Sequence, residues 1–139
     1  MSALIRQATC VAIEGRAVLI EGPPGIGKSS LALALIDRGA VLVGDDGVTL
    51  EARGARLWAS PPPNIGGKLE IRNVGIARFE TTEAPVALVI VLGEDAPRHV
   101  EGAETVVVGG IELPLVRLWP ASPVLALRAE WALKLHGPA

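Results

Sequence analysis

The sequence is poor in aromatic residues and has a single cysteine. Its 139 residues include no Tyr, one Phe and three Trp, although half of the chain is apolar. The core must therefore be filled by Val, Leu, Ile and Ala, a composition typical of a buried sheet covered by helices. The lone Cys10 excludes an internal disulfide and favours a reducing compartment.

Long apolar runs and an excess of one charge are also absent. The longest apolar run, residues 86–92, is far shorter than the roughly 20 residues of a membrane-spanning helix, and the first eight residues do not resemble a signal peptide. The net charge of −2 argues against attraction of the whole chain to nucleic acid or anionic lipid. We expect a cytoplasmic domain spanning residues 1–139, with no membrane or nucleic-acid partner.

The first third of the chain has a clear pattern of secondary structure. Two β-branched runs, residues 9–13 and 16–21, flank Glu14-Gly15 and predict a hairpin. Good helix formers then run from Lys28 to a glycine cap at Gly39. Further short apolar runs predict strands or hairpins at residues 40–43, 48–58, 86–92, 105–108 and 111–115.

Two later segments complete the predicted fold. Residues 68–79 predict a strand with a bulge or a close backbone approach at Gly75. A C-terminal helix is predicted with Ser122 as its N-cap and Pro123 at its first position, and its apolar stripe comprises residues 124, 127, 131 and 135. We expect an α/β phosphate-loop fold with a mixed, twisted sheet, the first helix against one face and the C-terminal helix covering another.

A glycine-rich stretch between the second strand and the first helix matches the phosphate-loop pattern G-x-x-x-x-G-K-[ST]. Its residues are Gly22, Pro23, Pro24, Gly25, Ile26, Gly27, Lys28 and Ser29. Glycines let successive backbone N–H groups turn toward an anion, and the following helix adds its positive dipole. We expect Lys28 to bind phosphate oxygens and Ser29 to coordinate Mg²⁺. A glycine turn with an exposed lysine is the plainer interpretation, but it requires no Lys-Ser pair.

Acidic residues in two segments are candidates for metal and proton chemistry. Asp45 and Asp46 follow the strand at residues 41–43, and we expect one carboxylate to face metal or water and the other a substrate hydroxyl. A solvated Asp-Gly turn is the alternative.

Glu70 and Arg72 share one face of a strand, where they suit a metal ion and a phosphate. An exposed ion pair of little energetic value explains the same spacing.

Three segments, GPPGIGKS, DRGAVLVGDD and KLEIRNVGI, together resemble the HPr kinase/phosphorylase family. These bacterial enzymes phosphorylate a serine of the phosphocarrier HPr and can remove that phosphate. The resemblance covers residues 7–79 closely and the C-terminal helix loosely. It implies the catalytic domain alone, without the N-terminal domain of longer relatives, and a fold similar to the nucleotide domain of phosphoenolpyruvate carboxykinase. Homo-oligomer formation, known in longer relatives, stays open.

The resemblance also implies cofactors, a partner and residue roles. The cofactors are ATP and Mg²⁺, and the partner is an HPr-like phosphocarrier. One aspartate of the pair would exchange the proton of the target serine, and which of the two does so stays open. The resemblance assigns catalytic roles to Lys28, Asp45, Asp46, Arg98 and the position of Gln7, and metal binding to Ser29 and Glu70.

Two positions depart from the family pattern. Gln7 stands where the family has a catalytic histidine, and Asn73 stands where the family usually has glycine. Because a glutamine amide cannot ionise near neutral pH, Gln7 keeps more than one function open for this chain. The leading hypothesis is an ATP-dependent serine kinase, with or without phosphorylase activity. The alternatives are a degenerate regulator that senses ATP and binds a partner, and a small-molecule kinase or other phosphate-loop NTPase.

Overall fold

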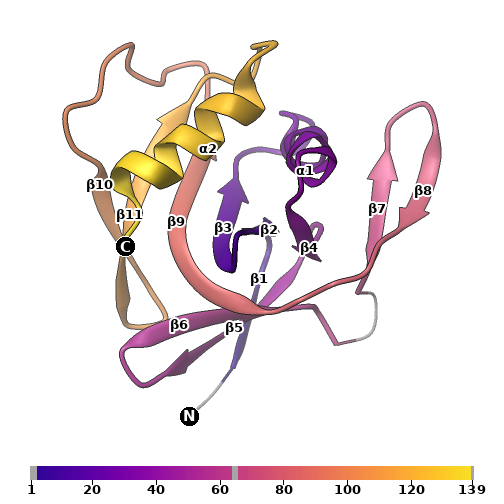
Figure 1. The fold of residues 1–139 in the computed structure, drawn as a ribbon, viewed down its shortest axis with the longest axis horizontal. Helices are drawn as coiled ribbons and strands as arrows, with labels where there is room; N and C mark the ends of the chain where they lie inside the picture. Colours follow the sequence, from indigo (N-terminus) through magenta and orange to yellow (C-terminus); the bar gives the residue numbers. More distant parts are fainter. Residues whose placement is uncertain (1–2, 64–65, 139) are drawn as a thin grey trace.

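The computed structural model describes residues 3–63 and 66–138. Within them, strands make up most of the regular structure, and two helices follow the third and the last strand (Figure 1). In chain order the elements are β1 (Leu4–Arg6), β2 (Thr9–Ile13), β3 (Arg16–Glu21), α1 (Lys28–Asp37), β4 (Val41–Gly44), β5 (Val48–Arg53), β6 (Arg56–Ser60), β7 (Lys68–Ile71), β8 (Gly75–Arg78), β9 (Ala84–Leu92), β10 (Glu104–Val108), β11 (Ile111–Leu118) and α2 (Leu125–His136).

A curled, mixed sheet forms the body of the molecule. Its strand order is β1-β5-β6-β9-β3-β2-β4, and β11 adds to β9 while carrying β10 on its outer edge. The long strand β9 pairs antiparallel with β6 at its start, and farther along it runs parallel to both β3 and β11. The carboxyl ends of β3, β9 and β11 consequently lie at the same edge of the sheet.

Both helices cover the same face of this sheet. Leu35 of α1 and Leu133 of α2 belong to one buried cluster with Ile20 and Ile90 from the central strands, and Arg38 and Glu130 join the two helices with N–O distances of 2.9 Å. The prediction that the C-terminal helix covers another face is therefore wrong. The other face is buried by the curl of the sheet itself, which leaves no room for a helix there.

The C-terminal helix also begins later and packs differently than predicted. The Ser122 hydroxyl accepts a hydrogen bond from the Val124 amide at 3.2 Å within a turn, and the helix itself begins at Leu125. The predicted apolar stripe is exposed, because the residues that face the core are Leu125, Ala129, Ala132 and Leu133. Two alanines in this set allow a close approach to the sheet, which a pattern of large apolar residues does not indicate.

Residues 68–79 form a hairpin rather than the single predicted strand. Strands β7 and β8 pair antiparallel as a separate small sheet beside α1, at the right of Figure 1. The turn places Asn73 at a φ of 70°, a left-handed conformation that glycine favours and asparagine tolerates. The prediction of a bulge or close approach at Gly75 is wrong, because no atom lies within 4 Å of a Cβ built there.

Candidate active site

The phosphate loop joins β3 to α1 through glycines with positive φ. Gly22 has a φ of 154°, and a Cβ there would lie 3.1 Å from the Leu92 carbonyl oxygen and 3.0 Å from the Ile26 side chain. Gly27, at a φ of 117°, caps α1, whose first turn contains no acidic residue. The free N–H groups and positive dipole of this helix end suit an anion such as a phosphate.

Lys28 and Ser29 begin the helix and face different partners. The Lys28 ammonium donates to the carbonyl oxygens of Gly22, at 2.7 Å, and Pro23, at 3.4 Å, so it lies across the loop. The Ser29 hydroxyl donates to Oδ1 of Asp45 at 2.7 Å. These contacts place a cation and a hydroxyl on the loop where the sequence predicts them.

The aspartate pair is divided between two environments. Asp45 is partly buried, and its Oδ1 accepts a second hydrogen bond, at 3.0 Å, from the Thr9 hydroxyl. Asp46 is exposed, has a φ of 59° and lines the pocket described below. The turn that contains both aspartates is tight, since a Cβ on Gly44 would lie 2.2 Å from the Gly47 carbonyl oxygen. One carboxylate is thus held in place and the other is free to meet a ligand.

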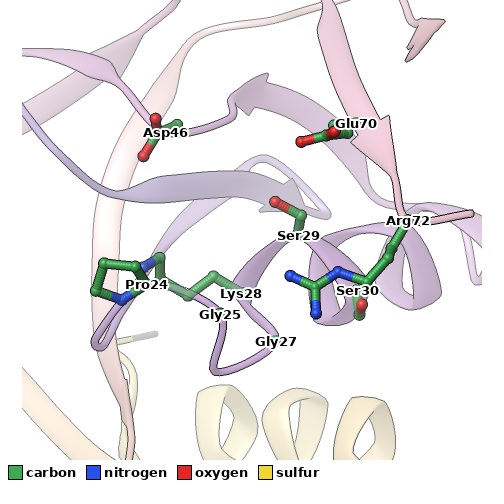
Figure 2. A pocket seen from close by; sticks show the side chains of 9 residues that line it. All are labelled: Pro24, Gly25, Gly27, Lys28, Ser29, Ser30, Asp46, Glu70 and Arg72. Carbon is green, nitrogen blue, oxygen red and sulfur yellow. The ribbon is translucent and has the colours of Figure 1, made fainter. Parts of the chain in front are cut away.

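A pocket of about 360 Å³ brings three distant segments together (Figure 2). In the view of Figure 2, the Ser29 hydroxyl lies between the Asp46 and Glu70 carboxylates, and the Arg72 guanidinium is directed toward the phosphate loop. The β7–β8 hairpin supplies Glu70 and Arg72, because Leu69 beside them is fully buried in the cluster that α1 shares. The complete lining is Pro24, Gly25, Gly27, Lys28, Ser29, Ser30, Asp46, Glu70 and Arg72.

Two predicted residues lie outside this pocket. Gln7 is exposed between β1 and β2 and does not line the pocket. Arg98 is exposed in the segment after β9, where it lines a separate groove with Trp119 and Arg128. The catalytic roles of Gln7 and Arg98 stay predictions.

Sequence reasoning missed two supports of the site. Thr9 is buried, with 1% of its surface exposed, and its hydroxyl fixes Asp45. The only signal was a hydroxyl residue at the start of an otherwise apolar run. Arg6 forms a two-pronged ion pair with Glu21, the residue before the phosphate loop, and this hydrogen bonding raises the pKa of the Arg6 guanidinium. The pair ties the edge strand β1 to the strand that enters the loop.

The pocket has the donor chemistry for Mg²⁺ together with a phosphate ligand. Within residues 3–63 and 66–138, no group of three or more His, Cys, Asp or Glu forms a ready-made metal site. Mg²⁺ commonly takes only one or two carboxylates and receives its other oxygens from phosphates and water. Ser29, Asp46 and Glu70 offer a hydroxyl and two carboxylates on one pocket, so the residues present fit this ion.

Comparisons with known proteins show which family and fold this chain shares. The family model of the HPr serine kinase C-terminal domain matches residues 2–82. The solved structure of the HPr(Ser) kinase/phosphatase from Coxiella burnetii superposes with a TM-score of 0.83 at 31% identity, covering 94% of this chain and 88% of that chain.

Curated relatives are members of the same family, and this chain spans less than half of the length of the two described here. HPr kinase/phosphorylase from Streptococcus salivarius is 37% identical over 122 residues, which cover 78% of this chain and 40% of the relative. The Brevibacillus brevis protein of the same name is 43% identical over 96 residues, covering 68% and 28%. No helix in the described part of this chain is long and apolar enough to cross a membrane. The chain belongs to the HPr kinase C-terminal domain family.

Proposed function

We propose that this chain is an ATP-dependent serine kinase whose substrate is an HPr-like phosphocarrier protein. The observation that carries the proposal is the convergence of Lys28, Ser29, Asp46 and Glu70 on one pocket from three separate segments. A protein that only binds nucleotide needs the phosphate loop, but it does not need a free carboxylate and a second carboxylate from a distant hairpin. The same convergence makes the regulator alternative the weaker one.

Phosphate binding falls to the loop and the residues that face it. The loop amides and the Lys28 ammonium neutralise phosphate oxygens, and the Arg72 guanidinium offers a further charged donor. Ser29 and Glu70 would hold Mg²⁺, which supplies charge neutralisation on the phosphates when it is bound. These groups are fixed by α1 and by the hairpin, so they need little rearrangement before transfer.

The division of the aspartate pair suggests which carboxylate takes the serine proton. Asp45 already accepts hydrogen bonds from Ser29 and Thr9, so we assign it to holding the Ser29 hydroxyl. Asp46 faces the pocket, so we assign it as the general base. In the transfer the serine oxygen bonds to the γ-phosphorus, the bond from that phosphorus to the bridging oxygen of ADP breaks, and Asp46 receives the serine proton.

The test mixes the protein with ATP, Mg²⁺ and the HPr-type protein of its own organism, and measures phosphoserine by mass spectrometry. Asp46→Asn should lower the transfer rate by about a hundredfold or more, whereas Asp37→Asn, on the exposed end of α1, serves as the charge-matched control. Loss of nucleotide binding in Lys28→Ala would support the phosphate role separately. Equal phosphoserine formation by wild type and an Asp45→Asn/Asp46→Asn variant would contradict the kinase proposal.

We expect the reverse activity to depend on the residue at position 7. The test incubates wild type and Gln7→His with inorganic phosphate and the phosphoserine form of the carrier, and measures the phosphorylase turnover of each. We propose that wild type is the weaker phosphorylase, because the amide cannot exchange a proton as imidazole does. A Gln7→His variant without any gain would remove residue 7 from the mechanism. The cytoplasmic location, the single-domain organisation, any oligomer and the likeness to the carboxykinase nucleotide domain stay proposals.

A further inference from the structure

A second hollow adjoins the phosphate loop beside the pocket. It has a volume of about 440 Å³ and is lined by Pro23, Pro24, Gly25, Ile26, Glu94, Pro120 and Ala121. Pro24 and Gly25 line both this hollow and the phosphate pocket, so the two share a wall. A ligand whose anionic end occupies the pocket can therefore extend across these two residues into the hollow.

The sheet topology explains why the hollow lies at this place. The parallel strands β3, β9 and β11 end at one edge, at the top of Figure 1, and the phosphate loop and the segments after β9 and β11 meet there. The Gly93 amide donates to the Leu118 carbonyl at 3.0 Å, and the Trp119 indole donates to the Ala96 carbonyl at 2.7 Å. The two outer segments are thus tied together, at the edge where open α/β sheets usually bind ligands.

The lining has a definite chemistry. Three prolines, an isoleucine and an alanine offer apolar side chains without donors, and polar atoms contribute a similar share of the lining. Glu94, which is exposed, is the one charged residue among the lining residues named above. A carboxylate without a cation beside it repels phosphates and accepts hydrogen bonds from N–H and O–H groups. The hollow therefore suits a flat, uncharged group that carries donors, while the pocket next to it suits the triphosphate.

We infer that this hollow is the subsite for the nucleobase, and that Glu94 accepts a hydrogen bond from the exocyclic amine of adenine. The inference rests on the proposed nucleotide-dependent function and extends it to base selection. Pro23, Pro24 and Pro120 provide the apolar surface against which the ring packs, and Glu94 favours adenine over hypoxanthine, which has a carbonyl oxygen in place of the amine. Glu94 is a specificity residue and takes no part in phosphoryl transfer.

The experiment measures the affinities of Mg²⁺ complexes of ATP, ITP and tripolyphosphate by calorimetry, for wild type and for Glu94→Ala. Wild type should prefer ATP to ITP by about tenfold, the usual value of one hydrogen bond to a charged group, and Glu94→Ala should lose that preference. Tripolyphosphate should bind no more weakly to Glu94→Ala, because it does not reach the hollow. Glu101→Ala, a loss of the same charge from an exposed site in the same segment, should keep the preference for ATP.

Other outcomes have distinct meanings. If Glu94→Ala weakens ATP and ITP equally, Glu94 contacts the ribose and the inference about the base is wrong. If wild type binds all three ligands equally, the hollow takes no base and the inference is overturned. If tripolyphosphate and ATP both fail to bind wild type, the proposed function fails as well, so the two failures are distinguishable.

Discussion

Leu69 links the packing of the β7–β8 hairpin to the chemistry of the pocket. Its side chain is fully buried in the cluster that contains Leu31 and Leu35 of α1, while Glu70 and Arg72 beside it line the pocket. The hairpin has a ladder of only four residue pairs and no strand of the main sheet at its side. Because an isolated hairpin is marginally stable in water, this one depends on its contact with α1.

The change Leu69→Ala removes buried apolar atoms and leaves a cavity. Such changes cost about 2–5 kcal/mol, and a loss of about 3 kcal/mol multiplies the population of the opened state by roughly 150. The main sheet keeps its own ladders when the hairpin opens. We therefore expect Leu69→Ala to lower the free energy of detaching the hairpin from α1 more than it lowers the free energy of global unfolding.

Amide hydrogen exchange with urea unfolding tests this expectation, together with the phosphoserine assay. In Leu69→Ala, the amides of β7 and β8 should exchange roughly a hundredfold faster, those of β3 and β9 should change far less, and phosphotransfer should fall while tripolyphosphate binding persists. Leu57→Ala, from the other buried cluster, should lower global stability without a selective effect on the hairpin. Equal acceleration of all amides, or unchanged phosphotransfer, would refute the reasoning.

Three further predictions concern the turn at Gly44, the support of Asp45 by Thr9 and the buried thiol of Cys10. Gly44→Ala should lower the free energy of unfolding in urea by about 2 kcal/mol or more, because its Cβ would lie 2.2 Å from the Gly47 carbonyl oxygen, whereas Gly102→Ala meets no atom within 4 Å and should change little. Thr9→Val should slow phosphotransfer about tenfold by removing a hydroxyl that holds the first aspartate, and Thr9→Ser should restore the rate. Burial raises the pKa of the Cys10 thiol. The contribution of the neutral thiol to the free energy of unfolding should therefore be complete below the unfolded thiol's pKa of about 8.5 and should fall at higher pH. Urea titrations at pH 7 and 10 should show this fall in wild type and not in Cys10→Ala.

The parts of the fold that sequence predicted well are those set by neighbouring residues. The strands at residues 9–13 and 16–21 have the predicted bounds, and the helix begins at Lys28 as expected. Alternating apolar runs, a Glu-Gly turn and a glycine-rich loop before good helix formers each act over a few residues. Local physical chemistry therefore suffices for them.

The errors arise where tertiary packing chooses between local options. The turn of the β7–β8 hairpin has no Gly-Pro or Asn-Gly signal at its centre; in the structure, the left-handed φ of Asn73 and the hydrogen bond from the Val74 amide to the Ile71 carbonyl close it. The face of α2 that packs inward is the one with Ala129 and Ala132, although Trp131 and Leu135 are more hydrophobic. Hydrophobic periodicity ranks faces by their apolar content, whereas packing also selects for close approach.

The division of the aspartate pair shows why the roles of single site residues were harder to predict than their presence. The sequence places Asp45 and Asp46 side by side, and nothing local distinguishes them. The distinction comes from Thr9, 36 residues away, and Ser29, 16 residues away, which both donate to the same oxygen of Asp45. Leu69 likewise anchors the hairpin that carries Glu70 and Arg72, so substitutions of such supporting residues should reduce activity before they unfold the protein.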